Sequence, residues 1–334
     1  MKKIIKKVLK RLRIFIGFLL LLIVIAGLGF RLFSKPHKPI GKLIDIGNTK
    51  LHIHATGKQS NKPTLVIENG GGVPSEHYYW LSKELKDSMR VVRYDRDGIG
   101  YSELSNSPRT PETIARELKT LLEKAGEKPP YILAGHSMGG LYIRVFAELY
   151  PELVTALIFI DATHPDQVTR LHAPSKSSFK FKTVLGLYNI LAVLGDLGIV
   201  GLYDHFFGPL LAAEGLPNEI NNRMSDFLIN GKLISAYRNE LKEYHTSLER
   251  ASAVNHFKSL PIRIFTAIKM NKEVYRKNGI DPDELLNKRI HMHNEYTNLS
   301  TNATQILING NHNTIYSKKE NATIICNEIL QLLK

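Results

Sequence analysis

The chain has 334 residues, of which 43% are hydrophobic and 23% are charged, a balance typical of folded globular proteins rather than disordered ones. Its single cysteine, Cys326, excludes an intramolecular disulfide and a cysteine-based zinc site. The net charge of +14 does not indicate nucleic-acid binding, because half of the surplus lies in residues 1–13 and no basic stripe interleaved with aromatic residues follows.

The first forty residues have the pattern of a membrane segment with basic flanks. Residues 1–13 hold seven Lys or Arg and no acid, and residues 14–30, IFIGFLLLLIVIAGLGF, hold no charge. This length is at the lower limit for crossing a bilayer and exceeds the usual apolar region of a cleavable signal peptide, and no clear cleavage site follows. We expect an uncleaved signal anchor over 14–30 and a linker over 31–40. A cleaved signal peptide and a buried core helix are the alternatives.

The charges on either side of this segment predict its orientation. Seven basic residues precede it, whereas four follow it closely, at Arg31, Lys35, Lys38 and Lys42. The more basic side of a membrane segment stays in the cytoplasm. We therefore expect a single-pass protein of the cell membrane, with a cytoplasmic N-terminus and the remaining domain on the extracytoplasmic side.

From residue 41 onward, strand and helix patterns alternate. Residues 41–57 read as a β-hairpin that turns at Gly47-Asn48, and apolar strands are predicted at 64–69, 89–95, 131–136 and 156–161. A helix capped by Thr110 ends at Gly126, and another follows residue 137 and ends before Pro151. Strands that are apolar throughout, with helices between them, indicate a parallel sheet covered on both faces.

The alternation stops after residue 161 and resumes near residue 262. Roughly 95 residues of mostly helical pattern separate the two parts, and the rhythm then continues with strands at 262–268 and 305–310 and a final helix. We predict one α/β domain over 41–334 with a doubly wound, mostly parallel sheet. A helical cap is inserted at about 165–260, and the transmembrane helix precedes the domain.

The stretch AGHSMGG places Ser137 between a predicted strand and a predicted helix. The pattern G-x-S-x-G arises by chance in roughly one such chain in ten, so the pattern alone carries little weight. Its setting is that of a nucleophile elbow, which presents a serine hydroxyl at the carboxyl edge of the sheet. The alternative is a turn of small residues that only lets the helix pack against the strand.

A serine nucleophile needs a base, and the best candidate is His312, directly after the last predicted strand. The order Ser, acid, His is that of hydrolases with this elbow. No Asp directly follows the strand at 262–268, so the sequence leaves several carboxylates open as the acid. Asp161, at the end of the strand 156–161, is favoured, with Glu273, Asp281 and Asp283 as alternatives.

Two backbone N–H groups are candidates for an oxyanion hole. One belongs to Met138 at the start of the helix, and the other to Gly71 in NGGG, directly after the strand 64–69. A phosphate-binding loop is the rival reading of NGGG, but the Lys-Ser/Thr ending of such a loop is missing. His291 and His293 could ligate a metal, yet no third ligand has a clear spacing, and a solvated helix face is the preferred interpretation.

Five segments, VIENGGG, VVRYDRDGIGYSE, YILAGHSMGGLYIRVFA, LIFIDATHPD and NGNHNTIY, resemble the α/β-hydrolase superfamily in content and order. The resemblance covers about residues 41–330. It implies Ser137 as nucleophile, His312 as base, and the N–H groups of Gly71 and Met138 as the oxyanion hole, without metal or organic cofactor. The chain lacks the family's usual acid after strand seven. The family also accepts an acid after strand six, which supports Asp161.

The activity that follows is hydrolysis of a carboxylic ester through an acyl-enzyme. The cap segment TVLGLYNILAVLGDLGIVGLYDHFFGPLL is strongly apolar, which together with the membrane segment favours a hydrophobic ester or acyl substrate. An amide or peptide hydrolase such as an aminopeptidase, and a low-turnover binding protein of the same fold, remain alternatives. Haloalkane chemistry is disfavoured, because it needs Asp in place of Ser137.

Overall fold

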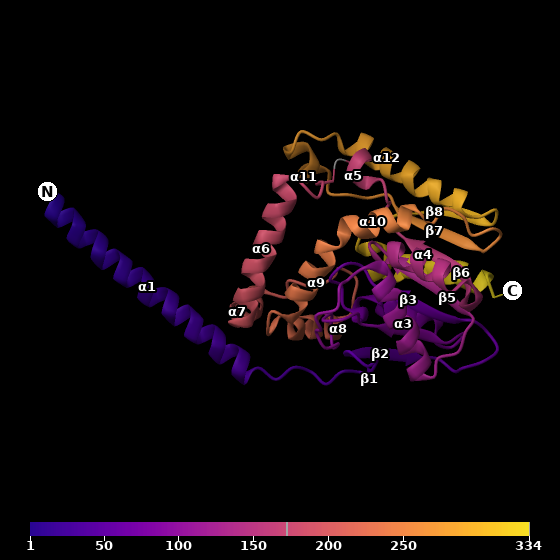
Figure 1. Cartoon of the computed structure of the whole chain (residues 1–334), viewed down its shortest axis with the longest axis horizontal. Helices are drawn as coiled ribbons and strands as arrows, with labels where there is room; N and C mark the ends of the chain where they lie inside the picture. The colour runs from indigo at the N-terminus through magenta and orange to yellow at the C-terminus, as the bar shows by residue number, and fades with distance from the viewer. Residues whose placement is uncertain (172, 334) are drawn as a thin grey trace.

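A computed structural model describes residues 1–171 and 173–333 of the chain (Figure 1). In this part, eight strands form one sheet in the order β1-β2-β4-β3-β5-β6-β7-β8. The strands are β1 (Lys42–Asp45), β2 (Lys50–Thr56), β3 (Thr64–Glu68), β4 (Val91–Tyr94), β5 (Tyr131–His136), β6 (Val154–Ile160), β7 (Ile262–Ala267) and β8 (Ala303–Ile308). β2 is antiparallel to β1 and β4, and all other neighbours are parallel. The predicted doubly wound, mostly parallel sheet is confirmed.

Helices precede, cover and interrupt this sheet. They are α1 (Lys2–Phe33), α2 (Tyr79–Leu85), α3 (Pro111–Ala125), α4 (Gly139–Leu149), α5 (Gln167–Arg170), α6 (Phe179–Asp196), α7 (Ile199–Phe207), α8 (Asn218–Met224), α9 (Lys232–Lys242), α10 (Tyr244–Ser252), α11 (Lys272–Lys277), α12 (Pro282–Asn294), α13 (Thr314–Ser317) and α14 (Lys319–Gln331). Short 3₁₀ turns lie at Ser75–Tyr78, Pro151–Leu153, Ser225–Leu228 and Glu295–Leu299.

Both faces of the sheet are buried, as the continuous apolar strands predicted. Along β5, Tyr131 and Leu133 enter the core layer shared with α3 and α4, whereas Ile132 and Ala134 enter the layer shared with α2, α13 and α14. Successive side chains of a strand point to opposite faces, so a strand that is covered on both sides buries all of its side chains and favours apolar residues throughout.

The cap comprises α5 to α10 and is inserted between β6 and β7. It has a small apolar core of its own, in which residues from α6, α8 and α9 pack together with Ile99 of the main domain. Because this core is continuous with a residue of the main domain, the cap is held against the sheet's carboxyl edge. In Figure 1, α6 and α9 lie between α1 and the sheet.

The helix α1 is longer than the predicted membrane segment, because it also includes the basic residues 2–13 and ends at Phe33. Lys, Arg, Leu and Ile extend a helix readily, so the change of polarity at residue 14 does not interrupt it. Within α1 only Gly27 is buried, and the apolar side chains are exposed around the helix. Residues 34–40 form an extended link to β1, close to the predicted linker.

Candidate active site

Ser137 occupies a strained turn between β5 and α4. Its φ is +51°, in the left-handed region that residues with a side chain rarely adopt. Such strain costs on the order of 1–3 kcal/mol and tends to persist where function needs it. The turn is tight because Gly139 passes the strand β3 so closely that an added Cβ would lie 2.4 Å from the carbonyl oxygen of Glu68. The structure therefore forms the sharp strand-to-helix turn that the sequence predicts.

Asp161 and His312 form a close pair at the same edge of the sheet. Asp161 directly follows β6, also with a positive φ of 41°, and His312 lies in the loop after β8. The imidazole Nδ1 lies 2.7 Å from Oδ2 of Asp161, and Oδ1 accepts the N–H of Ala267 at 2.9 Å. With Nδ1 protonated by this pairing, Nε2 of His312 carries the free lone pair that a general base needs.

The environment of Asp161 favours its charged form. The carboxylate is buried, which by itself would raise its pKa. The hydrogen bond and positive charge of His312, together with the charge of Arg289, outweigh this effect and hold the pKa of Asp161 well below its usual range. Asp161 is therefore an anion at neutral pH, able to orient an imidazole and to stabilise its protonated form.

The alternative acids are engaged elsewhere. Glu273 is exposed on α11 and pairs with Lys277 at 2.9 Å. Asp281 caps α12 by accepting the N–H of Asp283 at 2.9 Å, and Asp283 itself pairs with Lys272 at 2.6 Å. Of the four carboxylates that the sequence leaves open, the structure brings only Asp161 to His312.

Ser137 and His312 line a cavity of about 430 Å³ together with Gly71 and Met138. No hydrogen bond joins the Ser137 hydroxyl to the His312 ring in this structure, as is common before a substrate is bound. Neither Gly71 nor Met138 donates its backbone N–H to an acceptor within the described residues. An added Cβ at Gly71 would lie 2.6 Å from the sulfur of Met138, so the two candidate donors are close neighbours.

A buried ionic network holds the loop that carries Gly71. Arg96 is 1% exposed, and its guanidinium contacts Glu68 Oε1 at 2.5 Å and Glu240 Oε1 at 2.7 Å. It also donates to the carbonyl oxygens of Asn69 and Gly70, at 2.7 and 2.8 Å. The other oxygen of Glu240 accepts the N–H of Gly72 at 3.0 Å. Since Glu240 belongs to α9, the cap is bound directly to the candidate oxyanion loop.

Sequence reasoning missed this network. The signal was a pair of opposite charges at the ends of two buried strands. Glu68 is the last residue of β3, and Arg96 comes shortly after the end of β4. Charged residues are rarely buried unless they are paired, so two such positions at one sheet edge suggest a partner pair. The third member, Glu240, lies 144 residues from Arg96 in an amphipathic cap helix and had no local signal.

A second set of contacts links the oxyanion loop to His312. The N–H of Gly70 donates to the Tyr78 hydroxyl at 2.9 Å, so that hydroxyl donates to Nδ1 of His136, also at 2.9 Å. Nε2 of His136 donates to the backbone carbonyl of His312 at 3.0 Å, and the two rings pack with centroids 4.5 Å apart. Burial, assisted by the nearby charge of His312, lowers the pKa of His136, which matches a neutral ring with one N–H.

The two histidines of HMH do not share a solvated face, and that interpretation is wrong for His293. His291 is exposed, whereas His293 is buried with Nδ1 3.7 Å from Oδ1 of Asp161. Residues two apart on a helix point in nearly opposite directions, so only one of them faces away when α12 packs on β7. Burial lowers the pKa of His293 to about 4, and the ring is neutral beside the carboxylate.

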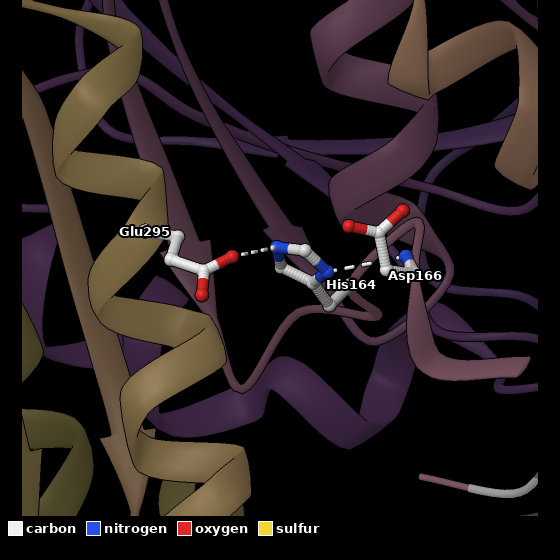
Figure 2. A group of neighbouring side chains, drawn as sticks. All are labelled: His164, Asp166 and Glu295. Carbon is white, nitrogen blue, oxygen red and sulfur yellow. Dashed lines mark hydrogen bonds and ion pairs between the residues drawn. The ribbon is translucent and has the colours of Figure 1, made fainter. Parts of the chain in front are cut away.

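A different group has the spacing of a metal site. His164, Asp166 and Glu295 each offer a ligand atom, and these atoms lie within 4.8 Å of one another. Figure 2 shows Glu295 and Asp166 at opposite edges of the imidazole. Nδ1 of His164 already accepts the N–H of Asp166 at 3.1 Å, and both oxygens of Glu295 bind Arg170, at 2.6 and 2.7 Å. These contacts account for the group without a metal: the ion pair and the turn order the loop after Asp161.

Comparison with known proteins agrees with the motifs and the topology. Residues 63–188 match the family model of the alpha/beta hydrolase fold. The chain is similar to a thermophilic esterase from Thermogutta terrifontis, with a TM-score of 0.60 and 18% identity over 90% of this chain and all of that one. The resemblance to the α/β-hydrolase superfamily that the motifs predicted is therefore confirmed, by the family model over residues 63–188 and by the fold over most of the chain.

Relatives in sequence are similar over shorter stretches. An uncharacterized protein of Bacillus subtilis, YbdG, is 33% identical over 129 residues, which are 38% of this chain and 39% of that protein. The human (lyso)-N-acylphosphatidylethanolamine lipase is 29% identical over 213 residues, 61% of this chain and 57% of the lipase. The matched regions span less than two thirds of these relatives.

Proposed function

We propose that this α/β hydrolase is a membrane-anchored serine hydrolase that cleaves hydrophobic carboxylic esters through an acyl-enzyme. One observation carries the proposal: Ser137 on its strained turn and His312, which is paired with Asp161, line one cavity, next to two backbone N–H groups without an acceptor in the described chain. These are the parts that acyl transfer to serine requires, in the relative order along the chain that this fold uses.

The chemistry proceeds in two displacements. The Ser137 hydroxyl attacks the ester carbonyl and gives its proton to Nε2 of His312, while the N–H groups of Gly71 and Met138 bind the oxyanion. The protonated His312 then donates that proton to the leaving alkoxide, and the acyl group stays on Ser137. Water, deprotonated by His312, attacks the acyl-enzyme, releases the acid and restores the serine. Asp161 orients the ring and stabilises its cation throughout.

The lining of the cavity favours an ester of an apolar acid. Cap residues form much of its wall, namely Phe181, Val184, Tyr237, Leu241 and Tyr244. An aminopeptidase must bind the charged α-amino group of its substrate, and a carboxylate is its usual partner. None of the described residues that line this cavity is Asp or Glu. The ester activity is therefore the better supported of the two hydrolase functions.

Membrane anchoring is supported by the character of α1. A helix of 32 residues with most of its apolar side chains exposed would be unfavourable in water, and residues 14–30 carry no charge. The seven basic residues before residue 14 favour a cytoplasmic N-terminus and a catalytic domain outside the cell. A protease added to intact cells should then digest the domain, and survival of the domain until lysis would contradict this orientation.

A fluorophosphonate probe tests the nucleophile. We expect it to label the full chain, and Ser137→Ala to abolish both labelling and turnover of nitrophenyl esters. The matched control is Ser177→Ala, an exposed loop serine, which should retain both. A panel of nitrophenyl esters of increasing acyl length, assayed beside aminoacyl anilides, then separates ester from peptide substrates.

The outcomes are distinct. Labelling that persists in Ser137→Ala would refute the nucleophile. Labelling without turnover of any ester or anilide would indicate a binding protein of this fold. Faster cleavage of aminoacyl anilides than of every ester would assign the alternative peptidase function.

A further inference from the structure

The cap presents an apolar strip to the outside. Seven large apolar side chains along α6, α7 and the following loop are between 52% and 75% exposed. They are Leu187, Ile190, Val193, Tyr203, Phe206, Phe207 and Leu210. We call these seven residues the cap strip. Exposed apolar patches of this kind mark contacts with another protein or with a membrane.

The two helices that carry most of the cap strip are joined by a turn that packs against the end of the apolar run of α1. Gly27 packs so closely on the turn between α6 and α7 that an added Cβ would lie 2.5 Å from the carbonyl oxygen of Leu197. On the facing side, a Cβ at Gly198 would lie 2.1 Å from the carbonyl oxygen of Gly27. Arg31 donates to the carbonyl of Asp196, and the rings of Phe30 and His205 lie 5.6 Å apart. The outer end of α1 is therefore packed against the turn that joins the two helices of the cap strip.

We infer that the cap strip lies in the lipid interface, on the side of the membrane where the catalytic domain sits. The inference rests on the membrane anchoring proposed above. If residues 14–30 cross the bilayer, the contact at Gly27 places α7 near the outer end of the crossing. α6 and α7 meet at 84°, and the inner face of α6 packs on α9, so they form an interfacial element and not a second crossing.

The charges next to the strip fit this position. Lys176, Lys180 and Lys182 are all exposed at the beginning of α6, around the exposed ring of Phe179. Lysines beside apolar residues are typical of helices that lie at a membrane surface, because their amino groups reach the phosphate of the headgroups. The occupant to which we assign the strip is thus the lipid bilayer.

The placement gives the substrate a source. Phe181 and Val184 on the inner face of α6 line the cavity of Ser137, while Leu187, Ile190 and Val193 lie on the outer face of the same helix. One helix therefore separates the lipid from the active site. An ester whose acyl chain is dissolved in the bilayer would reach the cavity without crossing water, and this is the substrate class that the geometry points to.

Environment-sensitive labels on single cysteines test the position. The full chain is reconstituted in vesicles of phosphatidylcholine and phosphatidylglycerol that contain spin-labelled lipid. Bimane is attached at Leu187→Cys, Ile190→Cys, Val193→Cys or Phe206→Cys. Leu20→Cys reports on α1. Leu149→Cys is the matched control, because α4 runs from the cap side to the opposite edge of the sheet and Leu149 is an exposed apolar residue at its far end. Cys326 is buried and stays unlabelled in the folded chain.

We expect blue-shifted emission and quenching by the spin-labelled lipid at the four cap positions and at Leu20→Cys, but neither at Leu149→Cys. Cap labels that behave like the Leu149→Cys label, while the α1 label is quenched, would overturn the inference and leave the anchoring intact. An α1 label without quenching would refute the anchoring. Cap labels that are blue-shifted yet not quenched would indicate a protein partner or a second copy, and would also overturn the inference.

A kinetic comparison tests the substrate source. The double variant Leu187→Asp, Ile190→Asp changes the cap strip but no residue that lines the cavity. Its turnover of a short, soluble nitrophenyl ester should stay within about twofold of the unchanged chain. Its turnover of a long-chain ester held in vesicles should fall at least tenfold. Equal effects on both substrates would contradict delivery from the lipid.

Discussion

Replacing Asp161 with Asn is the sharpest test of the candidate triad. The substitution keeps the shape of the side chain and one oxygen that can accept the N–H of Ala267, which lies 2.9 Å away. The amide NH₂ must then face Nδ1 of His312, at the position where the carboxylate oxygen lies 2.7 Å from the ring. An NH₂ group can only donate there, so the ring must carry its proton on Nε2. In that tautomer His312 cannot accept the proton of Ser137.

The expected loss is large. A wrong tautomer in a serine triad lowers kcat by about 10⁴-fold, and we expect about 10³ to 10⁴-fold here, which corresponds to roughly 4–5.5 kcal/mol of activation free energy. Steady-state hydrolysis of a nitrophenyl ester measures kcat and KM for both chains. KM should change little, because Asp161 is buried behind His312 and does not line the 430 Å³ cavity.

Two controls make the result interpretable. Thermal unfolding should show that the Asp161→Asn variant is folded at the temperature of the assay. Its loss of activity then cannot be explained by unfolding. Glu273→Gln, Asp281→Asn and Asp283→Asn each remove an alternative acid and should stay within about twofold of the unchanged chain. A rate for Asp161→Asn within tenfold of normal, together with a large loss in one of these three, would refute the assignment.

Further substitutions test the surroundings of the site. Gly71→Ala should lower kcat by about 10²-fold, because its Cβ would meet the sulfur of Met138 at 2.6 Å and displace an oxyanion donor, whereas Gly186→Ala, in open space on α6, should leave kcat unchanged. Glu240→Gln removes a buried partner of Arg96 and should lower the free energy of unfolding by about 3 kcal/mol; unchanged thermal unfolding would contradict that role. Burial lowers the pKa of His77 to about 4, so the unfolded chain binds a proton that folded His77 does not as the pH falls from 7 to 5. His77→Gln should therefore reduce the loss of stability over this range by about 2 kcal/mol, as measured by thermal unfolding at both pH values.

The fold was predictable because its signals are local. Each parallel strand is a short apolar run, and the helix α3 begins at the Thr110 cap and ends at Gly126, as the cap residues indicate. No single segment of the sequence predicts the order of the strands in the sheet. The extension of α1 through the basic residues was not predicted either, since helix formation follows backbone propensity and not the polarity on which the segment boundaries were drawn.

The candidate site was likewise predictable only where the signals are local. Ser137 and His312 each follow a predicted strand, so local patterns place both at the carboxyl edge. The choice of acid depends on which strand ends lie side by side, and β6 pairs directly with β7, which brings Asp161 against the N–H of Ala267. The sequence pattern favoured Asp161 but left the carboxylates after β7 as alternatives, because no single segment shows which strand ends lie side by side.

The pair between Arg96 and Glu240 bears on how substrate reaches the cavity. Swinging the cap away from the sheet would separate two groups that are 1% and 0% exposed, and breaking a buried pair costs about 3–5 kcal/mol. Less than about 1% of the molecules would have the cap opened in this way, because each 1.4 kcal/mol of free energy changes the ratio of two populations about tenfold. Entry past the beginning of α6, where Ala173 and Pro174 line the cavity, leaves this pair intact. An ester that entered this way from the lipid inferred above would pass the lysines near the beginning of α6 and would reach Ser137 with the oxyanion loop held in place.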